Sequence, residues 1–385
     1  MKRFFVLLLF FLLLLSTLVF SYKVTFIVEA PGYTQDDVLY LAGDFNGWNP
    51  KDSRFTLHRD GETFKGTFDM SGKIEFKVTR GSWETVEKGE KGEEIPNKVL
   101  VIDKDIQVRI KVYHWRDFVE KQAAGLKPTY TGNIKLIKDF YSPELGNTRN
   151  IIVYLPPDYE TNQGRYPVLY MHDGQNIFDE TTSFSGMEWR ADESAEELIN
   201  KGIIKPIIIV GIYNTENERI NEYSPWVDKL YGGGKGDLYA EFIVKTLKPF
   251  IDKNFRTLPD RQNTAILGSS MGGLISLYIG LKYIDVFSKI GVMSPSFWFA
   301  DENIFDFVKQ TSVENSICIY LDVGTMEGSN PEEYIKATRN MYKLLQAKEN
   351  TEVLYMEDRG AIHSESAWAK RFPEVLVYFF SKEGN

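Results

Sequence analysis

Residues 268–272, which read Gly-Ser-Ser-Met-Gly, constrain the fold of this chain more than any other short stretch. The apolar run 264–267 leads directly into them, and a helical pattern begins at Met271. Glycines at both ends let a strand and the following helix approach closely, and the tight turn presents the central side chain, Ser270, at the carboxyl edge of a sheet. We therefore predict a strand–turn–helix unit with Ser270 as a candidate nucleophile. An ordinary glycine-rich turn is the alternative.

The chain around this unit, from about residue 131 onward, alternates strand patterns with helical patterns. Its strand candidates are apolar runs, as expected for strands that are buried on both faces of a parallel sheet. They are residues 150–155, 168–171, 207–211, 264–267, 317–321 and 353–355. Helical periodicity fits residues 237–253, 274–283, 331–348 and 366–380. We predict an α/β domain with a mainly parallel sheet over residues 131–385.

The region before this domain has a β pattern. Short strand candidates separated by glycine and asparagine-glycine turns lie at 24–28, 38–42, 63–68, 73–78, 99–102 and 106–110. This spacing predicts a small all-β sandwich over residues 22–113. We interpret the charged stretch 84–94 as a solvated loop, and residues 114–130 as a linker that contains a short helix.

The first 21 residues have the pattern of a targeting segment. Lys2 and Arg3 precede the apolar run 4–20, and Ser21 offers a small residue at a cleavage point. We predict a signal peptide over residues 1–21 and export of the mature chain, either to the periplasm or out of the cell. An uncleaved membrane anchor is the alternative, because an apolar run of this length can just span a bilayer. Beyond this segment we expect no membrane contact.

Charge and cysteine content exclude several classes of protein. The chain has 45 Lys and Arg residues against 54 Asp and Glu residues, a net charge of −9, whereas nucleic-acid binding needs a basic surface. The one cysteine, Cys318, excludes an internal disulfide and a multi-cysteine zinc site. It lies in an apolar run, so we interpret it as a strand residue rather than a nucleophile. No histidine–carboxylate motif for a metal-dependent hydrolase is present, and no metal is expected.

A serine nucleophile needs a base, and the chain has four histidines. His58 and His114 fall in the β region and the linker, and His172 follows a predicted strand. His363 lies between the last predicted strand and the last predicted helix. In hydrolases of the α/β type the chain order is nucleophile, acid, histidine. Only His363 follows Ser270, so we predict that His363 is the base.

The acid that orients this histidine should follow an intervening strand, and residues 317–321 are that strand. Two carboxylates compete for the role. Asp322 lies at the end of the strand, where a carboxylate can be structural, and Glu327 lies in the loop beyond it, free to reach His363. We favour Glu327, and Asp322 stays as the alternative.

An oxyanion intermediate needs two backbone N–H donors. One comes from the residue after the nucleophile, Met271, and the other from the loop after an earlier strand. Residues 168–171 are such a strand, and Gly174 allows the following loop to bend. We predict that the Gln175 N–H is the second donor. A plain glycine turn is the alternative for this loop.

At these residues the chain resembles a known family. The resemblance is carried by residues 169–179, Trp189, 217–225, 268–273 and 321–327, and covers about residues 131–382. They resemble the putative esterase family, which includes esterase D, enterochelin and other siderophore esterases, feruloyl esterases, S-formylglutathione hydrolases and mycolyltransferases. The resemblance implies a small-molecule ester substrate, no metal and no cofactor. It places the acid three residues after a glycine, here Gly324, which again favours Glu327.

The N-terminal region carries a second resemblance, through residues 41–50, 74–77, 81–83 and Asn97. These are similar to immunoglobulin-like starch- and glycogen-binding modules, which stack sugar rings on two tryptophans. The resemblance implies that Trp48 and Trp83 stack on an oligosaccharide and that Lys77 and Asn97 form hydrogen bonds with it. A module kept only for packing is the alternative. The two-domain arrangement also resembles thermostable bacterial esterases with an immunoglobulin-like domain.

Together these features predict a secreted serine carboxylesterase. Its aromatic residues between the His172 loop and Ser270, without a long apolar lid, favour short, aromatic or polar esters over long fatty ones. These aromatics are Phe178, Phe184, Trp189, Tyr213, Tyr223 and Trp226. One alternative is an acyltransferase. The other is a polysaccharide-binding protein, which has either an accessory feruloyl or acetyl esterase activity on glycans or no catalytic activity. A homo-oligomer remains open.

Overall fold

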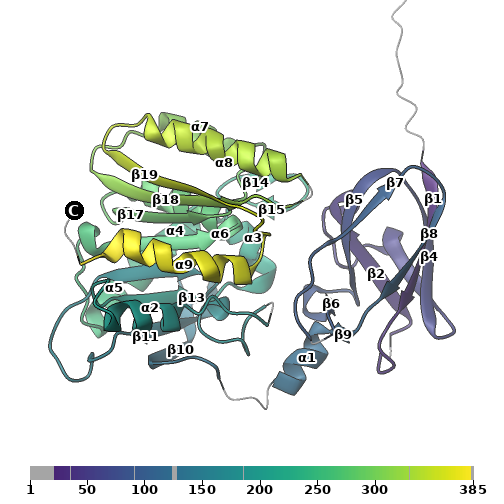
Figure 1. Ribbon diagram of the computed structural model, residues 1–385, viewed down its shortest axis with the longest axis horizontal. Helices are drawn as coiled ribbons and strands as arrows, with labels where there is room; N and C mark the ends of the chain where they lie inside the picture. Colours follow the sequence, from purple (N-terminus) through teal and green to yellow (C-terminus); the bar gives the residue numbers. More distant parts are fainter. Residues whose placement is uncertain are drawn as a thin grey trace, which may run out of the picture. The chain divides into compact units, whose positions relative to one another are not determined.

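The structure is a computed structural model. It describes residues 21–382 apart from 35, 91, 124–127, 185 and 329, and only the backbone of 120–123 and 216. The predicted signal peptide therefore lies outside the described residues, except for Ser21. The described residues form two compact units, both drawn in Figure 1. One runs up to Val86 and includes Asn97–Val112, and the other contains Glu87–Pro96 and the chain from Tyr113 onward.

The first unit is built from strands joined by short turns. Its strands are β1 (Tyr22–Glu29), β2 (Val38–Gly43), β3 (Thr56–Asp60), β4 (Thr63–Met70), β5 (Gly72–Thr79), β7 (Lys98–Ile102) and β8 (Ile106–Lys111). They form one sheet in the order β7-β5-β2-β3-β4-β1-β8. β1 and β8 pair in parallel, and the other neighbours are antiparallel.

Alternating residues of these strands supply the core of the first unit. Val24, Phe26 and Val28 of β1 are fully buried, while the residues between them are only partly buried. This is the two-residue period of a strand with one face packed. The Phe26 ring lies edge-on to that of Phe76 on β5, with the centroids 5.3 Å apart, although β1 and β5 are not neighbours in the sheet. The sheet therefore curls so that strands near its two ends pack face to face.

The second unit alternates strands and helices. Its strands are β6 (Glu87–Lys88), β9 (His114–Trp115), β10 (Asn133–Ser142), β11 (Asn147–Leu155), β12 (Val168–His172), β13 (Ile208–Ile212), β14 (Val227–Asp228), β15 (Gly232–Gly233), β16 (Thr264–Ser269), β17 (Lys289–Met293), β18 (Ile317–Gly324) and β19 (Thr351–Asp358). Its helices are α1 (Arg116–Ala123), α2 (Ala191–Asn200), α3 (Arg219–Glu222), α4 (Gly236–Glu241), α5 (Lys248–Asn254), α6 (Met271–Lys282), α7 (Asn303–Gln310), α8 (Pro331–Gln346) and α9 (Glu365–Phe380). A π-helical segment, Phe242–Leu247, joins α4 to α5.

The main sheet of this unit has the order β10-β11-β13-β12-β16-β17-β18-β19. β10, β11 and β13 pair antiparallel, and from β13 to β19 every neighbour is parallel. The predicted α/β architecture with a mainly parallel sheet is confirmed. Because the parallel strands all end at one edge, the loops after β12, β16, β18 and β19 gather there.

Helices cover both faces of the main sheet. α2 and α9 pack against each other on one face, where Phe372 and Ala195 join Leu169 in one apolar cluster. Figure 1 shows these two helices lying across the sheet. The other face carries α4 to α8, whose buried side chains, such as Leu274 and Leu345, join a larger cluster. The nearly all-apolar strands fit this two-sided burial.

Several elements of the main unit are missing from the sequence-based expectation, among them β10, α7, β17 and α2, and the last two show the physical reason. β17 is short, and Gly291 interrupts its apolar pattern. A Cβ at Gly291 would lie 2.1 Å from Leu267 Cδ1, so only glycine fits against the neighbouring strand. α2 is rich in acidic residues, and its fully buried apolar residues, Ala191 and Ala195, are small. Neither segment therefore shows the broad apolar pattern on which sequence reasoning depends.

The charged stretch 84–94 corrects another expectation. Glu87 and Lys88 are buried and form β6, which pairs with β9. The Lys88 ammonium donates hydrogen bonds to Glu94 and to the carbonyl of Phe184, both at 2.6 Å. The prediction of a solvated loop was wrong here because a buried charge is tolerated once it is paired and hydrogen-bonded, which composition does not reveal.

Two further features bear on the sequence-based expectations. Cys318 lies on β18, where burial raises the pKa of its thiol and so opposes formation of a thiolate. Within the described part of the chain, no helix combines the length and the apolar character needed to cross a bilayer.

Candidate active site

Ser270 lies in the turn between β16 and α6, in a backbone conformation that is rare for a residue with a side chain. Its φ is 58° and its ψ is −122°. A Cβ at Gly268 would lie 2.6 Å from the backbone of Gly272, so the strand and the helix can approach this closely only with glycine. The Ser270 N–H donates to the carbonyl of Met293 on β17 at 3.0 Å, which holds the turn. This is the geometry that presents a serine hydroxyl at the edge of a sheet.

A second serine lies beside the first. Ser270 Oγ and Ser296 Oγ are 3.2 Å apart, and the Ser296 N–H donates to the carbonyl of Ser270 at 3.0 Å. Ser296 is buried and comes just after β17. No sequence pattern singles out Ser296, because β17 itself was not predicted.

The structure brings the predicted acid and the predicted base together. Glu327 Oε2 lies 3.0 Å from His363 Nδ1, with the carboxylate fully buried and the imidazole about one quarter exposed. Because an ionised carboxylate only accepts hydrogen bonds, Nδ1 carries the proton and Nε2 is the ring nitrogen able to accept one. No hydrogen bond joins His363 to Ser270 among the described residues. In the absence of substrate such contacts are often long.

The Glu327 carboxylate is held from several sides. Its Oε1 accepts hydrogen bonds from Ser294 Oγ at 2.5 Å and from the Gly324 N–H at 2.6 Å. Burial opposes its ionisation, but the hydrogen bonds from His363, Ser294 and Gly324 outweigh it and lower its pKa. A Cβ at Gly324 would lie 2.5 Å from the carbonyl of Ala361 and 2.7 Å from Glu327 Oε1. The glycine three residues before the acid is therefore required by close packing around the carboxylate.

Asp322, the alternative acid, contacts a different group. Its carboxylate accepts hydrogen bonds from Arg371 Nε at 2.8 Å and from the Ser294 N–H at 3.0 Å, and it is fully buried. Burial raises its pKa to about 6, although the Arg371 guanidinium opposes this shift. Asp322 therefore supports the strand end and the guanidinium, as expected of a structural carboxylate.

Two residues of α9 that were not predicted from the sequence also contact the groups around Glu327. Arg371 Nη2 and Trp368 Nε1 both donate to Ser294 Oγ, at 2.8 and 2.9 Å, and Ser294 in turn bonds to Glu327. The Trp368 ring also lies edge-on to the His363 ring, with the centroids 5.0 Å apart. The two residues are one helical turn apart on α9, but no sequence pattern shows that this turn faces β17 and β18.

The predicted oxyanion donors lie after two neighbouring parallel strands, β12 and β16. Met271 begins α6, and Gln175 lies in the 3₁₀ turn Gly174–Asn176 that follows β12. The Gln175 side chain accepts a hydrogen bond from the Asn214 N–H at 3.2 Å, and its carbonyl accepts one from Thr182 Oγ1 at 2.7 Å. These contacts fix the turn, and the Gln175 N–H donates to no acceptor in the described part of the chain.

The loop before Gln175 is anchored by a partly buried ion pair between Asp173 and Arg219. The Asp173 carboxylate accepts two hydrogen bonds from the Arg219 guanidinium, both at 2.8 Å, and one from Asn214. The hydroxyl of Tyr223 accepts a hydrogen bond from the Asp173 N–H. Arg219 and Tyr223 belong to the segment 217–225 that carried the family resemblance, so this part of the resemblance has a structural purpose. The contacts anchor the loop next to the serine turn.

His172 is not suited to act as a base. It is fully buried, and its Nδ1 lies 2.9 Å from the hydroxyl of Tyr239. Burial lowers the pKa of its imidazole to about 3, so the ring stays neutral. His172 thus packs beneath the loop, while His363 keeps its exposed edge.

Comparison with protein families decides the identity of the second unit. The model of the family "Esterase", described as putative esterase, matches residues 142–379, more than half of the chain. The chain belongs to this esterase family. It is a carboxylic ester hydrolase, as the family and its esterase relatives show.

Several relatives of this esterase are informative. It is 30% identical over 256 residues to an endo-1,4-beta-xylanase/feruloyl esterase of Xylanibacter ruminicola, a match that covers 65% of this chain and 31% of the relative. It is also similar to an amylopullulanase of Thermoanaerobacter thermohydrosulfuricus, 40% identical over 103 residues, which are 25% of this chain and 7% of that one. The crystal structure of the enterobactin esterase of Shigella flexneri shares the fold. It has a TM-score of 0.53 at 14% identity and 93% coverage of both chains.

Three aromatic side chains lie in successive contact, starting at the His363 ring of the esterase. The Tyr334 ring lies 5.8 Å from the His363 ring, and the Tyr334 hydroxyl accepts a hydrogen bond from Trp298 Nε1 at 2.8 Å. The Trp298 ring packs edge-on to Tyr231, with the centroids 5.5 Å apart. Trp298 remains 42% exposed. These three aromatics, Tyr231, Trp298 and Tyr334, form a wall next to the catalytic histidine candidate.

This wall differs from the aromatics that sequence reasoning selected. Phe178, Trp189 and Tyr223 are buried in the core of the esterase unit and cannot line a cleft. The aromatic wall comes instead from the segments after β17 and β14 and from α8. Their side chains meet only in the folded chain, so no local pattern marks them.

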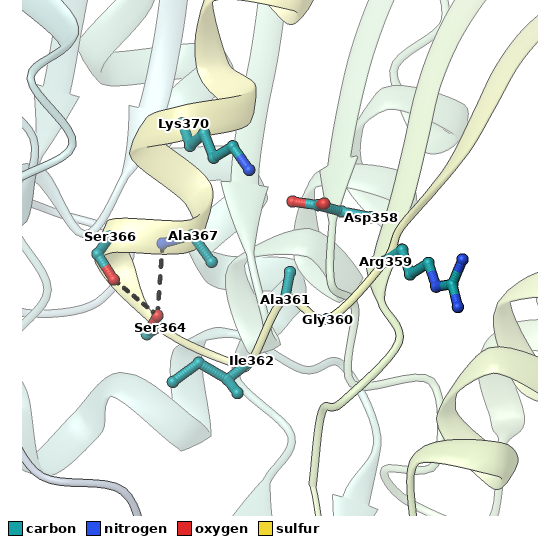
Figure 2. Close-up of a pocket in the computed structure, with 9 residues that line it drawn as sticks. All are labelled: Asp358, Arg359, Gly360, Ala361, Ile362, Ser364, Ser366, Ala367 and Lys370. Atoms are coloured by element: carbon teal, nitrogen blue, oxygen red, sulfur yellow. Dashed lines mark hydrogen bonds between the residues drawn. The ribbon is translucent and has the colours of Figure 1, made fainter.

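An open pocket lies along the loop that carries His363. It is lined by Asp358, Arg359, Gly360, Ala361, Ile362, Ser364, Ser366, Ala367 and Lys370 (Figure 2). Ser364 caps α9 by accepting a hydrogen bond from the Ala367 N–H. None of the candidate triad residues lines this pocket, so it neighbours the candidate active site without containing its reacting groups.

The four residues of the suggested glycan site lie in the first unit of the esterase, far in sequence from the candidate triad. The rings of Trp48 and Trp83 lie 6.4 Å apart at an interplanar angle of 36°, and both are partly exposed. Asn97 donates a hydrogen bond to the Glu75 carboxylate at 3.3 Å. Lys77 lies on β5 and is largely buried. The two tryptophans are thus neighbours, as a shared stacking surface requires.

Proposed function

We propose that this esterase uses Ser270 as nucleophile, His363 as general base and Glu327 as the orienting acid. The contact between Glu327 Oε2 and His363 Nδ1 carries the proposal, because it fixes the tautomer whose Nε2 can accept the serine proton. Ser270 supplies the second element, since its turn is the strained one that exposes a serine hydroxyl.

The proposed reaction runs in two halves. His363 Nε2 takes the proton of Ser270 Oγ as the oxygen attacks the ester carbonyl, and the N–H groups of Met271 and Gln175 stabilise the oxyanion. The tetrahedral intermediate collapses, the alcohol leaves with the proton from His363, and an acyl-Ser270 ester remains. Water, activated by the same histidine, then releases the carboxylic acid. The ionised Glu327 stabilises the imidazolium in both halves.

The substrates we propose are short-chain, aromatic or polar esters. The wall of Tyr231, Trp298 and Tyr334 beside His363 offers flat apolar faces, on which an aromatic acyl group can stack. The feruloyl esterase named among the relatives supports an aromatic acid. We expect kcat/KM to be higher for butyryl and feruloyl esters than for decanoyl esters, measured on nitrophenyl or methyl esters. A preference for the decanoyl ester would contradict this assignment.

An acyltransferase would use the same acyl-enzyme and differ only in the acceptor. The same assay separates the two activities when an alcohol acceptor is added. For a hydrolase, the carboxylic acid stays the main product as the alcohol concentration rises. Transfer of most acyl groups to a dilute alcohol would instead identify a transferase.

For the first unit we propose an immunoglobulin-like module over residues 22–113 that binds an oligosaccharide through Trp48 and Trp83. The neighbouring tryptophan rings and the similarity to an amylopullulanase support this. An exposed aromatic ring stacks on the apolar face of a sugar, and groups such as Lys77 and Asn97 supply hydrogen bonds.

The test is titration of the full chain with maltoheptaose, followed by tryptophan fluorescence. Trp48→Ala and Trp83→Ala should each weaken binding by about 1 kcal/mol or more, with little change in melting temperature. Tyr141→Ala is the matched control, because Tyr141 is an exposed aromatic (57%) on β10 of the other unit. Absence of binding at millimolar sugar would leave a module kept for packing.

We also propose that the mature esterase is exported after removal of residues 1–21. The support is the charged start, the apolar run 4–20 and the small Ser21 in the sequence. N-terminal sequencing of protein purified from the periplasm or medium of an expressing bacterium should begin at residue 22. Retention of Met1 would favour an uncleaved anchor.

A further inference from the structure

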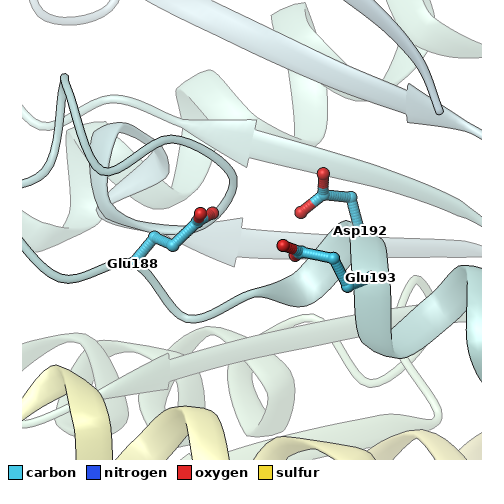
Figure 3. A group of neighbouring side chains, drawn as sticks. All are labelled: Glu188, Asp192 and Glu193. Atoms are coloured by element: carbon cyan, nitrogen blue, oxygen red, sulfur yellow. The ribbon is translucent and has the colours of Figure 1, made fainter. Parts of the chain in front are cut away.

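Three carboxylates meet at the start of α2, away from Ser270 and His363 in the sequence. Glu188 precedes the helix, and Asp192 and Glu193 lie in its first turn. One carboxylate oxygen of each lies within 4.8 Å of those of the other two (Figure 3). Asp192 is fully buried, Glu188 is 3% exposed, and Glu193 is partly exposed, so the cluster is closed except on the Glu193 side.

Each carboxylate uses one oxygen for a protein partner and leaves the other without one. Glu188 Oε1 accepts a hydrogen bond from Thr129 Oγ1 at 3.0 Å, and Asp192 Oδ2 accepts from the Thr131 N–H. Glu193 Oε1 pairs with the exposed Arg190 guanidinium at 3.4 Å. The remaining oxygens, Glu188 Oε2, Asp192 Oδ1 and Glu193 Oε2, are buried and accept no hydrogen bond from any described residue.

Unpartnered buried carboxylate oxygens are costly unless a proton or a cation joins them. Among the described residues, Arg190 is the one basic side chain that forms an ion pair with the cluster, and it reaches only Glu193. The cluster therefore lacks a positive charge at its centre.

We propose that Glu188, Asp192 and Glu193 bind one hard divalent cation of the size of Ca²⁺. Carboxylate oxygens are the ligands that Ca²⁺ prefers, at 2.3–2.6 Å, so two oxygens on opposite sides of one ion are about 5 Å apart. One carboxylate oxygen of each of the three residues lies within 4.8 Å of the others, which is inside this separation of about 5 Å. The hydrogen bonds from Thr129 and Thr131 orient two of the carboxylates, as outer partners of metal ligands commonly do.

Such an ion would connect three separate segments of the esterase unit. It joins α2 and the Glu188 loop, and both are hydrogen-bonded to Thr129 and Thr131 before β10. Trp189, next to Glu188, packs on Trp368, whose ring contacts His363. The ion is thus a structural one that steadies the surroundings of the proposed histidine, and takes no part in the reaction derived above.

The experiment uses the full chain stripped of metal with a chelator. Ca²⁺ should bind with one ion per chain in calorimetry and raise the melting temperature by several degrees, and Tb³⁺ should show luminescence sensitised by Trp189. Loss of one hydrogen-bonding partner of a metal ligand weakens metal binding about 10-fold or more. Glu188→Gln and Asp192→Asn each remove a charged ligand, so each should weaken Ca²⁺ binding by at least about 10-fold. Glu197→Gln is the matched control, because Glu197 lies on the same helix, is 64% exposed and pairs with Lys201.

A second readout needs no variant. In the metal-free wild-type chain, the Tb³⁺ luminescence sensitised by Trp189 should fall as Ca²⁺ is added, because both ions compete for the same carboxylates. Absence of binding at millimolar Ca²⁺ would overturn the proposal and leave a proton-sharing cluster. Binding that both variants retain would place the ion elsewhere and equally overturn the proposal.

Discussion

Ser270→Ala should lower kcat for nitrophenyl ester hydrolysis by about 10⁶-fold, the scale seen when the serine of a catalytic triad is removed. The reason is chemical: Ser270 Oγ is the hydroxyl that the strained turn between β16 and α6 presents, and alanine has no nucleophilic atom. Folding should change little, because the Ser270 side chain makes one hydrogen bond, to Ser296, which has other contacts through its backbone. Residual activity would come from the oxyanion donors and substrate binding alone.

The neighbouring serine supplies the matched control. Ser269 ends β16, next to Ser270, and is buried. Ser269→Ala should retain most of the turnover, and a serine-directed phosphonate should label Ser270 in the wild-type chain, as located by mass spectrometry of peptides. An adduct on Ser269 or Ser296, or full turnover by Ser270→Ala, would remove Ser270 from the role of nucleophile.

Glu327→Gln should lower kcat by about 10⁴-fold while the fold persists, the scale seen when the acid of a triad becomes an amide. The amide can keep the hydrogen bonds from Ser294 and the Gly324 N–H, but it no longer stabilises an imidazolium and can donate to His363 Nδ1, which selects the wrong tautomer. KM should change much less than kcat, because Glu327 is fully buried and reaches no substrate.

Asp322→Asn should give the opposite balance between stability and turnover. It leaves the buried Arg371 without its main counter-charge, and removal of one partner of a buried ion pair costs about 3–5 kcal/mol. The drop in kcat should be smaller than for Glu327→Gln, because Asp322 reaches His363 only through Arg371, Ser294 and Glu327. Denaturant unfolding and steady-state kinetics on both variants measure this. A larger loss of kcat in Asp322→Asn, with little loss of stability, would transfer the orienting role to Asp322.

Order along the chain was enough to predict much of this protein. A nucleophile turn is a local structure, set by glycines that let backbone approach backbone, so residues 268–272 and the strand before them were recognisable without a structure. The long apolar runs predicted β12, β16 and β18, because strands buried on both faces need apolar residues at successive positions. With Ser270 fixed, only one of the four histidines lay on its C-terminal side, and the predicted base followed.

Segments with a weak apolar pattern were missed, because the prediction of strands and helices depended on that pattern. Gly291 interrupts the apolar pattern of β17, because only glycine fits against Leu267. The first turn of α2 is acidic, because two of the three clustered carboxylates lie there. In both cases tertiary contacts, rather than local propensity, determine the residue types. The buried Lys88 was misjudged likewise, since its partners Glu94 and Phe184 lie six and 96 residues away.

The sequence by itself determined the location of the serine turn, the α/β order and the position of the histidine, because each depends on residues adjacent in the chain or on their order. Only the tertiary structure showed which of Glu327 and Asp322 contacts the histidine. Both carboxylates are buried, five residues apart, and their contacts differ because one faces His363 and the other faces Arg371. Arg371, Trp368 and Ser294 likewise meet around the acid only when α9 packs across β17 and β18. The direction in which a buried side chain points is decided by packing between elements distant in sequence, and no local pattern encodes it.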